Sequence, residues 1–180
     1  GNALYAVFRM LAQLLLIGYL LAYIFDADSP LIILGVLLVM VVASSWIALG
    51  TVSDDRVALF RHALIAIFVG GASVLALMTE GVLVIDPWYQ PQTMIPLAGM
   101  IFANSMNSVS LAAERLNSEM RRGESFDEAR HIAMRSSLIP VINSLFAVGL
   151  VSLPGMMTGQ ILSGVSPLVA ARYQIMVMCM

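Results

Sequence analysis

Long apolar stretches follow one another along this chain, separated by short segments that carry most of its charges. A window of about 19 residues finds stretches at residues 3–25, 31–50, 63–85, 94–113 and 138–164, and a further one that begins near residue 167. The first three are each roughly 20 residues or longer, which as helices would cross a hydrocarbon core of about 30 Å. Helices satisfy their own backbone hydrogen bonds in lipid. We therefore predict an all-α polytopic transmembrane bundle of about six spans.

The composition agrees with a membrane protein. Of the 180 residues 60% are hydrophobic and 11% are charged, with a mean hydropathy of +0.92, more apolar surface than a soluble core could bury. We expect one transmembrane permease domain over residues 1–180, with a cytoplasmic loop or short helix at 114–137. The chain begins at Gly1 without a signal peptide and stops at Met180 while still apolar, so we expect further helices beyond one or both ends.

The basic residues predict an orientation. All nine are Arg, and seven of them gather in the segments around residues 56–61 and 115–135, whereas the segments at 26–30 and 80–91 carry acidic residues and no Arg. Positive residues in short loops stay cytoplasmic. The first two segments are therefore predicted inside, the other two outside.

Several kinds of site are disfavoured by the residues present. A chain without Lys cannot contain the Walker A lysine that binds nucleotide phosphates, so any ATP must be bound by another chain. His62, His131 and Cys179 lie far apart in the sequence, which is not the spacing of a zinc site. We expect no cofactor, no covalent chemistry and no nucleic-acid partner.

The fifth apolar stretch is interrupted. Its sequence Leu153-Pro-Gly-Met-Met-Thr-Gly-Gln160 contains a helix-breaking pair, Pro154-Gly155, and a broken membrane helix needs neighbouring helices or a polar cavity around its free backbone groups. The alternatives are a solute pathway and a tight helix contact through Gly155 and Gly159. Met156 and Met157 are weak candidates for binding a soft metal, and packing is the favoured explanation for them.

Polar residues follow one face of the fourth stretch. At 100° per residue, Asn104, Asn107, Ser108 and Glu114 share this face with apolar Met100 and Leu111. Asparagines in the bilayer either hydrogen-bond between helices or line a solute path, and the pattern does not decide between these. Arg9 and Gln13, four residues apart, share a face of the first stretch, where snorkelling and bonding between helices are favoured.

A capping box marks the polar segment between the fourth and fifth stretches. Ser125 followed by Glu128 predicts the start of a short helix, which could lie across the cytoplasmic face and dock a partner. An ordinary solvated loop is the alternative.

Three blocks carry a likeness to a known family. The segments Ile95-Pro-Leu-Ala-Gly-Met-Ile-Phe-Ala-Asn104, Gly149-Leu-Val-Ser-Leu-Pro-Gly-Met-Met-Thr-Gly-Gln160 and Tyr173-Gln-Ile-Met-Val177 resemble the FetB family of ABC-transporter permeases, which includes plant aluminium-tolerance permeases. The likeness covers essentially the whole chain. It departs from the family's pattern before Glu128, where Arg-Arg-Gly-Glu-Ser replaces a more apolar stretch.

The resemblance implies a permease that works with a separate ABC ATPase subunit, in a dimer of permeases in the cell inner membrane, and exports iron or another metal. A passive channel or an ion-coupled carrier is the rival from another class, and a structural subunit is a third possibility. The candidate residues for the path or gate are Arg9, Gln13, Asn104, Asn107, Pro154, Gly155, Met156, Met157, Thr158, Gly159 and Gln160, and the resemblance favours those of the interrupted fifth stretch, from Pro154 to Gln160. Those that it favours for ATPase docking are Gly123, Glu124, Ser125, Phe126, Glu128, Ala129 and Arg130.

Overall fold

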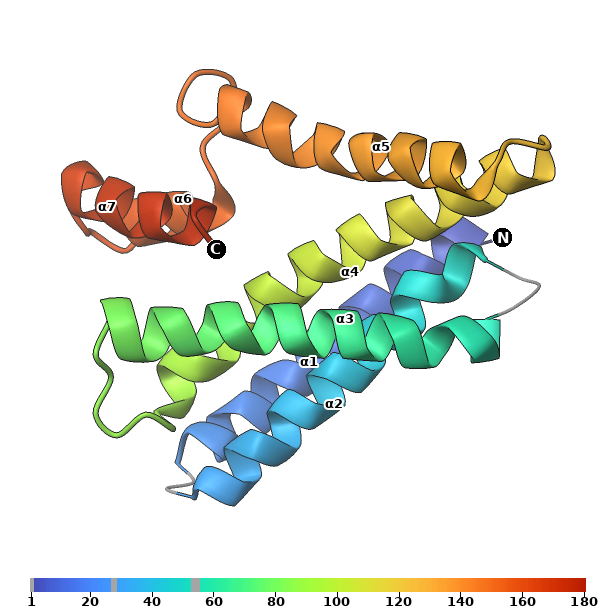
Figure 1. Cartoon of the computed structure of the whole chain (residues 1–180). Helices are drawn as coiled ribbons and strands as arrows, with labels where there is room; N and C mark the ends of the chain where they lie inside the picture. Colours follow the sequence, from blue (N-terminus) through green and yellow to red (C-terminus); the bar gives the residue numbers. More distant parts are fainter. Residues whose placement is uncertain (1, 27–28, 53–55) are drawn as a thin grey trace.

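The computed structural model describes residues 2–26, 29–52 and 56–180, with only the backbone described at residues 2 and 3. Within these ranges the regular structure is helical, which confirms the predicted all-α class. Nine elements follow one another: α1 (Asn2–Phe25), α2 (Pro30–Ala48), the 3-10 turn η1 (Leu49–Thr51), α3 (Arg56–Ala76), the π-helical η2 (Leu77–Val82), α4 (Pro91–Arg121), α5 (Phe126–Ala147), α6 (Gly155–Leu162) and α7 (Pro167–Met178) (Figure 1).

Three helical stretches of the described chain are long and apolar enough to cross a membrane. They are Leu4–Phe25, Pro30–Thr51 and Arg56–Val82, and they coincide with the first three predicted spans. The helices α4 and α5 have 31 and 22 residues but carry polar residues along part of their length. Long helices with a polar face suit the interior of a membrane bundle, where such residues avoid lipid.

The core lies where α2, α3 and α4 pack together. Its fully buried side chains include Ile33 on α2, Ile67 on α3 and Phe102 on α4. Gly71 allows the closest approach, because a Cβ atom there would lie 2.6 Å from Cε1 of Phe102. By contrast α1 is exposed over most of its apolar length, including Leu4, Phe8 and Tyr19, as expected of a helix that faces lipid.

The segment expected as a loop at 114–137 is different in the structure. Helix α4 continues to Arg121 and α5 begins at Phe126, so only residues 122–125 connect them. The predicted short helix after Ser125 is the first part of a 22-residue helix. Ala129 and Ala133 of α5 are 0% and 4% exposed. Small side chains allow two helices to pack closely, and α5 packs along α4 in this way.

The predicted interruption of the fifth span is confirmed, and it is wider than the Pro-Gly pair. Helix α5 ends at Ala147 and α6 begins at Gly155. The segment between them bonds to itself: the N–H of Val151 donates to the carbonyl of Ala147 at 2.9 Å, and the N–H of Gly149 donates to the carbonyl of Ser152 at 3.0 Å. Gly149 has φ +79°, a conformation that favours glycine. Pro154 is the N-cap of α6, so it precedes a helix and does not kink one.

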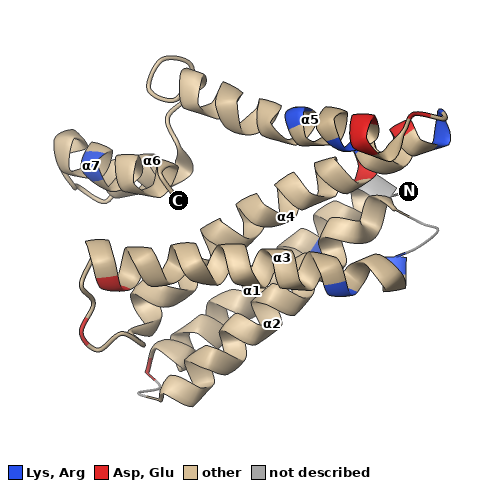
Figure 2. Cartoon of the chain, in the orientation of Figure 1, with Lys and Arg blue, Asp and Glu red and all other residues tan. Residues whose placement is uncertain are grey.

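The connections alternate between the two ends of the bundle. In Figure 1 the end of α2, the start of α3 and the α4–α5 connection lie at one end of the bundle, and the end of α1, the start of α2 and the α3–α4 connection lie at the other. Figure 2 shows basic and acidic residues together at the first end, and acidic residues without basic neighbours at the α3–α4 connection of the second. The Arg residues at the start of α3 and those around the α4–α5 connection thus share one end, as the predicted topology requires. Which end faces the cytoplasm stays a prediction.

Candidate functional site

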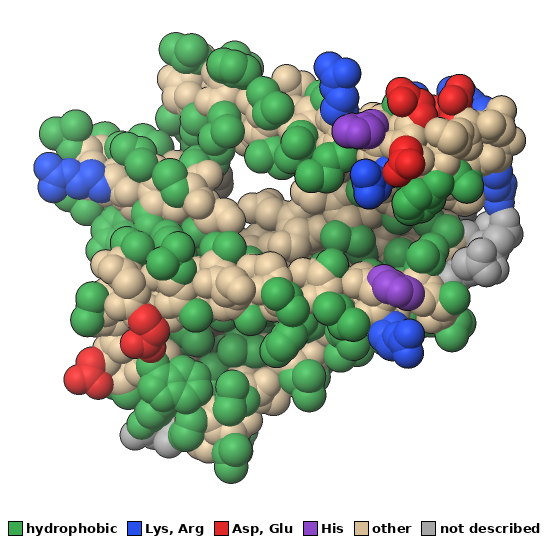
Figure 3. Space-filling view, in the orientation of Figure 1, with side chains coloured by type: hydrophobic (Ala, Val, Ile, Leu, Met, Phe, Trp, Pro, Cys, Tyr) green, Lys and Arg blue, Asp and Glu red, His purple; other side chains and the backbone are tan. Residues whose placement is uncertain are grey.

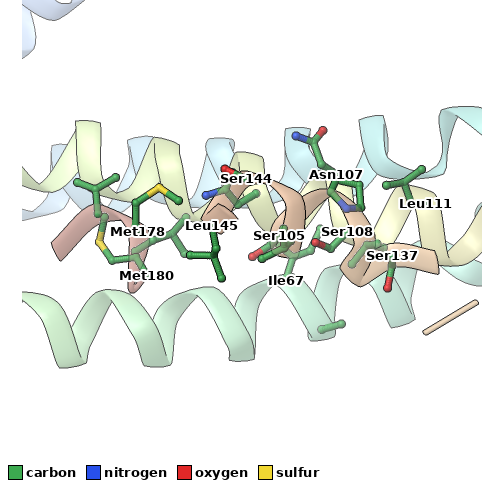
Figure 4. A pocket seen from close by; sticks show the side chains of 17 residues that line it. Ile67, Ser105, Asn107, Ser108, Leu111, Ser137, Ser144, Leu145, Met178 and Met180 are labelled. Carbon is green, nitrogen blue, oxygen red and sulfur yellow. The ribbon is translucent and has the colours of Figure 1, made fainter. Parts of the chain in front are cut away.

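A cavity of about 570 Å³, with a wall of both apolar and polar side chains, lies between α3, α4, α5 and the C-terminal end of the chain. We call it the asparagine cavity (Figure 4). Figure 3 shows the molecule hollowed between α5 and the helices beneath it. The polar lining side chains are Asn104, Ser105, Asn107 and Ser108 of α4, and Ser137 and Ser144 of α5.

Helical spacing explains this lining. Positions three and four apart share a helix face, so Asn104, Asn107, Ser108 and Leu111 all open onto the asparagine cavity. Ser137 and Pro140 of α5 line the opposite wall. Pro140 donates no backbone hydrogen bond, which leaves a carbonyl of the preceding turn without its helical donor. Asn104 and Asn107, both predicted for the path, therefore line one cavity. Ser137 and Ser144 of α5 line it as well, and they were not predicted from the sequence.

A second cavity, of about 530 Å³, lies between the first half of α4, the α3–α4 connection and the C-terminal helices. We call it the methionine cavity. It is lined by Leu83, Ile85, Gln92, Thr93, Pro96, Leu97, Met100, Met156, Tyr173 and Met176. Three of these are methionines, and they come from α4, α6 and α7. The predicted pathway residue Met156 therefore lies here, in the first turn of α6.

The remaining candidates of the fifth span lie on or next to α6. Met157, Thr158 and Gln160 are half-buried, and Gly155 and Gly159 are exposed. The amide oxygen of Gln160 is buried and has no hydrogen-bond partner within the described chain, and the same holds for Gln174 of α7. Two unpaired acceptors on two helices that contact each other are unusual, because most buried side-chain polar atoms are paired.

Arg9 and Gln13 lie apart from both cavities. Both are exposed on α1, and neither lines the asparagine cavity or the methionine cavity. Helix α1 touches the rest of the bundle mainly along α4. The structure therefore does not bring these two residues together with Asn104, Asn107 or α6.

The candidate docking residues surround the start of α5. The Oγ of Ser125 accepts a hydrogen bond from the N–H of Glu128 at 3.4 Å, which confirms the predicted N-cap. Phe126 is 56% exposed, and Arg130 pairs weakly with Asp127 at 3.7 Å. Gly123 has φ +91°, which suits a glycine at the end of α4. Ala129 is the exception in this set, because it is fully buried and packs inward.

Sequence reasoning missed a buried carboxylate at the end of α4. Glu119 is 4% exposed and pairs with Arg115 at 2.7 Å and with Arg122 at 3.4 Å. The spacings of four and three residues could have indicated these pairs. A polar cavity of about 390 Å³, lined by Thr51, Glu114, Asn117, Ser118, Arg121 and Arg122, lies at the same end. This end of α4 is therefore a charged, ordered surface.

The described residues contain no group of three His, Cys, Asp or Glu side chains that could hold a metal ion together. Oxygen atoms of Asn, Ser and Gln and the thioethers of Met are what the two cavities offer. Hard cations accept carbonyl and hydroxyl oxygens, and soft cations accept thioethers.

Comparison with known proteins decides the family. The model of the Uncharacterised protein family UPF0014 matches residues 1–130 and 122–180. The chain belongs to this family. Relatives of this UPF0014 chain include a UPF0014 membrane protein of Synechocystis, 38% identical over 99% of the chain and 74% of the relative. The "probable iron export permease protein FetB" of Escherichia coli is 36% identical over 98% of the chain and 72% of the relative.

A plant relative extends the family beyond bacteria. The protein named ALUMINUM SENSITIVE 3 of Arabidopsis thaliana is 34% identical over the whole chain and 70% of the relative. No solved structure matches the chain. The family assignment confirms the resemblance seen in the sequence. The chain therefore belongs to a family of membrane proteins.

The family model matches the chain in two pieces that meet at the α4–α5 connection. The two matched pieces overlap at residues 122–130, where this connection lies. The alignment with the Synechocystis relative runs over 195 positions, more than the 180 residues of this chain. That relative therefore has residues with no counterpart here.

Proposed function

We propose that this chain is the membrane-spanning permease subunit of an ABC transporter that exports iron or another metal. A separate ATPase subunit would bind and hydrolyse ATP, and two permeases would pair in the cell inner membrane. The observation that carries the proposal is the asparagine cavity, because polar side chains gathered on one cavity of an apolar helical bundle are what a solute path requires. The name of the Escherichia coli relative, a probable iron export permease, supports the direction and the solute.

In this mechanism the solute moves along α4. Asn104 and Asn107 line the asparagine cavity toward the Arg-bearing end, and Met100 lines the methionine cavity on the other half of the helix. The break between α5 and α6 gives the path a movable wall, because residues 148–154 join two helices without continuing either. Re-packing of helices around such a joint can open a cavity first to one side and then to the other. Pro154 to Gln160 would form the gate.

The ATPase would dock at the start of α5. Its exposed side chains Phe126, Glu128 and Arg130 lie at the end of the bundle where the start of α3 and the α4–α5 connection carry Arg. Glu119 beneath them holds Arg115 and Arg122 and so keeps the α4–α5 connection ordered. A force applied to the first turn of α5 would then reach Ser137 and Ser144 through one continuous helix.

A passive channel or an ion-coupled carrier is the second candidate. The asparagine cavity is equally compatible with a channel or a carrier. The lining of the cavity includes no acidic residue that would relay protons, which argues against a proton-coupled carrier. The two classes differ in their need for ATP.

The test is ATP-dependent metal transport into inside-out membrane vesicles that contain the intact permease with its ATPase partner. Iron should accumulate only with ATP and only when both subunits are present. Equal accumulation without ATP would favour the channel or carrier and would overturn the transporter assignment.

A further inference from the structure

The methionine cavity brings together thioethers from three helices. Met100 is on α4, Met156 is in the first turn of α6, and Met176 is on α7. They are separated by 56 and 20 positions in the sequence, so only the fold collects them. All three are half-buried and line one cavity of about 530 Å³.

These methionines differ from those that fill the core. Met78 and Met94 are 6% and 5% exposed and are enclosed by neighbouring side chains. Met100 and Met176 also pack partly against the core, as methionines commonly do, but all three methionines of the methionine cavity border open space as well. They leave room for a bound atom.

The other side chains of the methionine cavity limit which cations it could bind. It consists of apolar side chains with Gln92, Thr93 and Tyr173, and it contains no carboxylate, imidazole or thiol. Neutral thioethers bind soft cations such as Cu(I), and carboxylates or carbonyls are preferred by hard ones. A neutral ligand set in an apolar surrounding also favours one positive charge over two, because the cost of burying an ion rises with its charge.

We propose that Met100, Met156 and Met176 form a binding site for a soft monovalent cation of the Cu(I) and Ag(I) class. For the proposed transporter, this adds soft monovalent cations to iron as a candidate class of solute, and the inference rests on that function to this extent. Binding itself is a property of the cavity and is measured without transport.

Silver(I) is the probe, because it binds thioethers and does not change its oxidation state in air. The intact protein, purified in detergent, carries Cys179→Ser throughout, since Cys179 is an exposed thiol. We expect one Ag(I) per chain by titration calorimetry, with sulfur neighbours in its X-ray absorption spectrum. Replacing Met100, Met156 and Met176 together by Leu, a near-isosteric change, should weaken binding at least 100-fold.

The matched control replaces Met10, Met120 and Met134 by Leu. These three are exposed on α1, α4 and α5, and none lines the methionine cavity. The control should bind Ag(I) as the parent does, and both triple variants should keep the parent's circular dichroism. If the parent binds no Ag(I), or if the cavity variant binds it as tightly as the control, the site does not exist. If the cavity variant loses Ag(I) binding while its ATP-dependent iron transport persists, the site exists but iron export does not depend on it.

Discussion

At the scale of single residues, the proposed function depends most on the polar side chains of α4 that line the asparagine cavity. Asn104 and Asn107 are exposed to a cavity within the bundle, where a side-chain amide can offer both an acceptor and donors. Ser137 and Ser144 lie across the cavity from them; the Ser137 hydroxyl donates to the carbonyl of Met134 at 2.9 Å and can still accept a hydrogen bond. Such a lining can replace part of a solute's water shell without a fixed charge.

Replacing both asparagines by leucine should slow transport. Each amide contributes about 0.5–1.5 kcal/mol as a hydrogen-bond partner, so the Asn104→Leu, Asn107→Leu variant should lower ATP-dependent metal uptake by roughly tenfold, at about 1.4 kcal/mol per tenfold. Initial uptake rates in vesicles, normalised to protein abundance, measure this. Asn143→Leu is the matched control, because Asn143 is an exposed asparagine of α5 that does not line the asparagine cavity. Equal rates in the double variant and the control would remove the asparagines from the path.

Glu119 has a structural part at the same scale. Its buried carboxylate pairs with Arg115 and Arg122, and loss of a hydrogen bond to a charged group costs about 1.5–3 kcal/mol. We expect Glu119→Ala to lower the midpoint of thermal unfolding in detergent, and Glu124→Ala, at an exposed position, to leave it unchanged. Equal midpoints would mean that the charge cluster does not hold the end of α4.

At the scale of helices, close packing between α3 and α4 depends on Gly71. A Cβ there would lie 2.6 and 2.7 Å from ring atoms of Phe102, whose side chain is 3% exposed and cannot swing away. Overpacking of this kind costs about 1–3 kcal/mol, of which the helix preference of Ala returns about 1 kcal/mol, so Gly71→Ala should be destabilised by up to about 2 kcal/mol. Gly70→Ala is the control, since nothing lies within 4 Å of a Cβ there and Ala favours a helix by about 1 kcal/mol. Thermal unfolding should order the variants as Gly70→Ala, parent, Gly71→Ala. Any other order would contradict the packing.

The start of α5 makes a separate prediction about coupling. Charge reversal at Glu128 or Arg130 should reduce stimulation of the ATPase by the permease, because exposed charges at an interface mainly set orientation and association. ATP hydrolysis by the assembled transporter measures it. Glu80→Lys, an exposed change near the other end of the bundle, should hydrolyse ATP as the parent does. Unchanged hydrolysis in both reversal variants would mean that this surface contacts solvent and does not dock the ATPase.

Elements defined by local pattern were predictable from the sequence. The first three spans follow from apolar length, and Ser125 follows from capping chemistry, because both depend on neighbours in the chain. The length of α4 beyond Ala113 did not follow from hydropathy, since Glu119 is polar in sequence and becomes buried only through Arg115, Arg122 and the packing of α5. The methionine cavity could not be predicted, because its three methionines meet only in the folded chain.

At the scale of the whole molecule, the alternating connections give the bundle two chemically different ends. The asparagine cavity lies along the half of α4 that runs toward the Arg-bearing end, and the methionine cavity lies along the other half. A path along α4 therefore runs from one end of the bundle toward the other.

The predicted orientation can be tested by labelling. In a Cys179→Ser background, Phe126→Cys should be shielded from an impermeant thiol reagent in intact cells, and Asp86→Cys should react, because positive loops stay cytoplasmic. Both positions are exposed. The reverse pattern of labelling would put the docking surface on the wrong side of the membrane for an ATPase.

The most direct test asks whether transport passes through the asparagine cavity in the assembled protein. Asn107→Cys, in the Cys179→Ser background with the ATPase present, is treated after folding with a charged methanethiosulfonate reagent, and ATP-dependent metal uptake is then measured. A control Cys at Asp86, in the α3–α4 connection, is treated identically. We predict that the reagent abolishes uptake in the Asn107→Cys protein and spares the control, and that a reducing agent restores it. Full uptake by an Asn107→Cys protein that mass spectrometry shows to be completely labelled would contradict a path through this cavity.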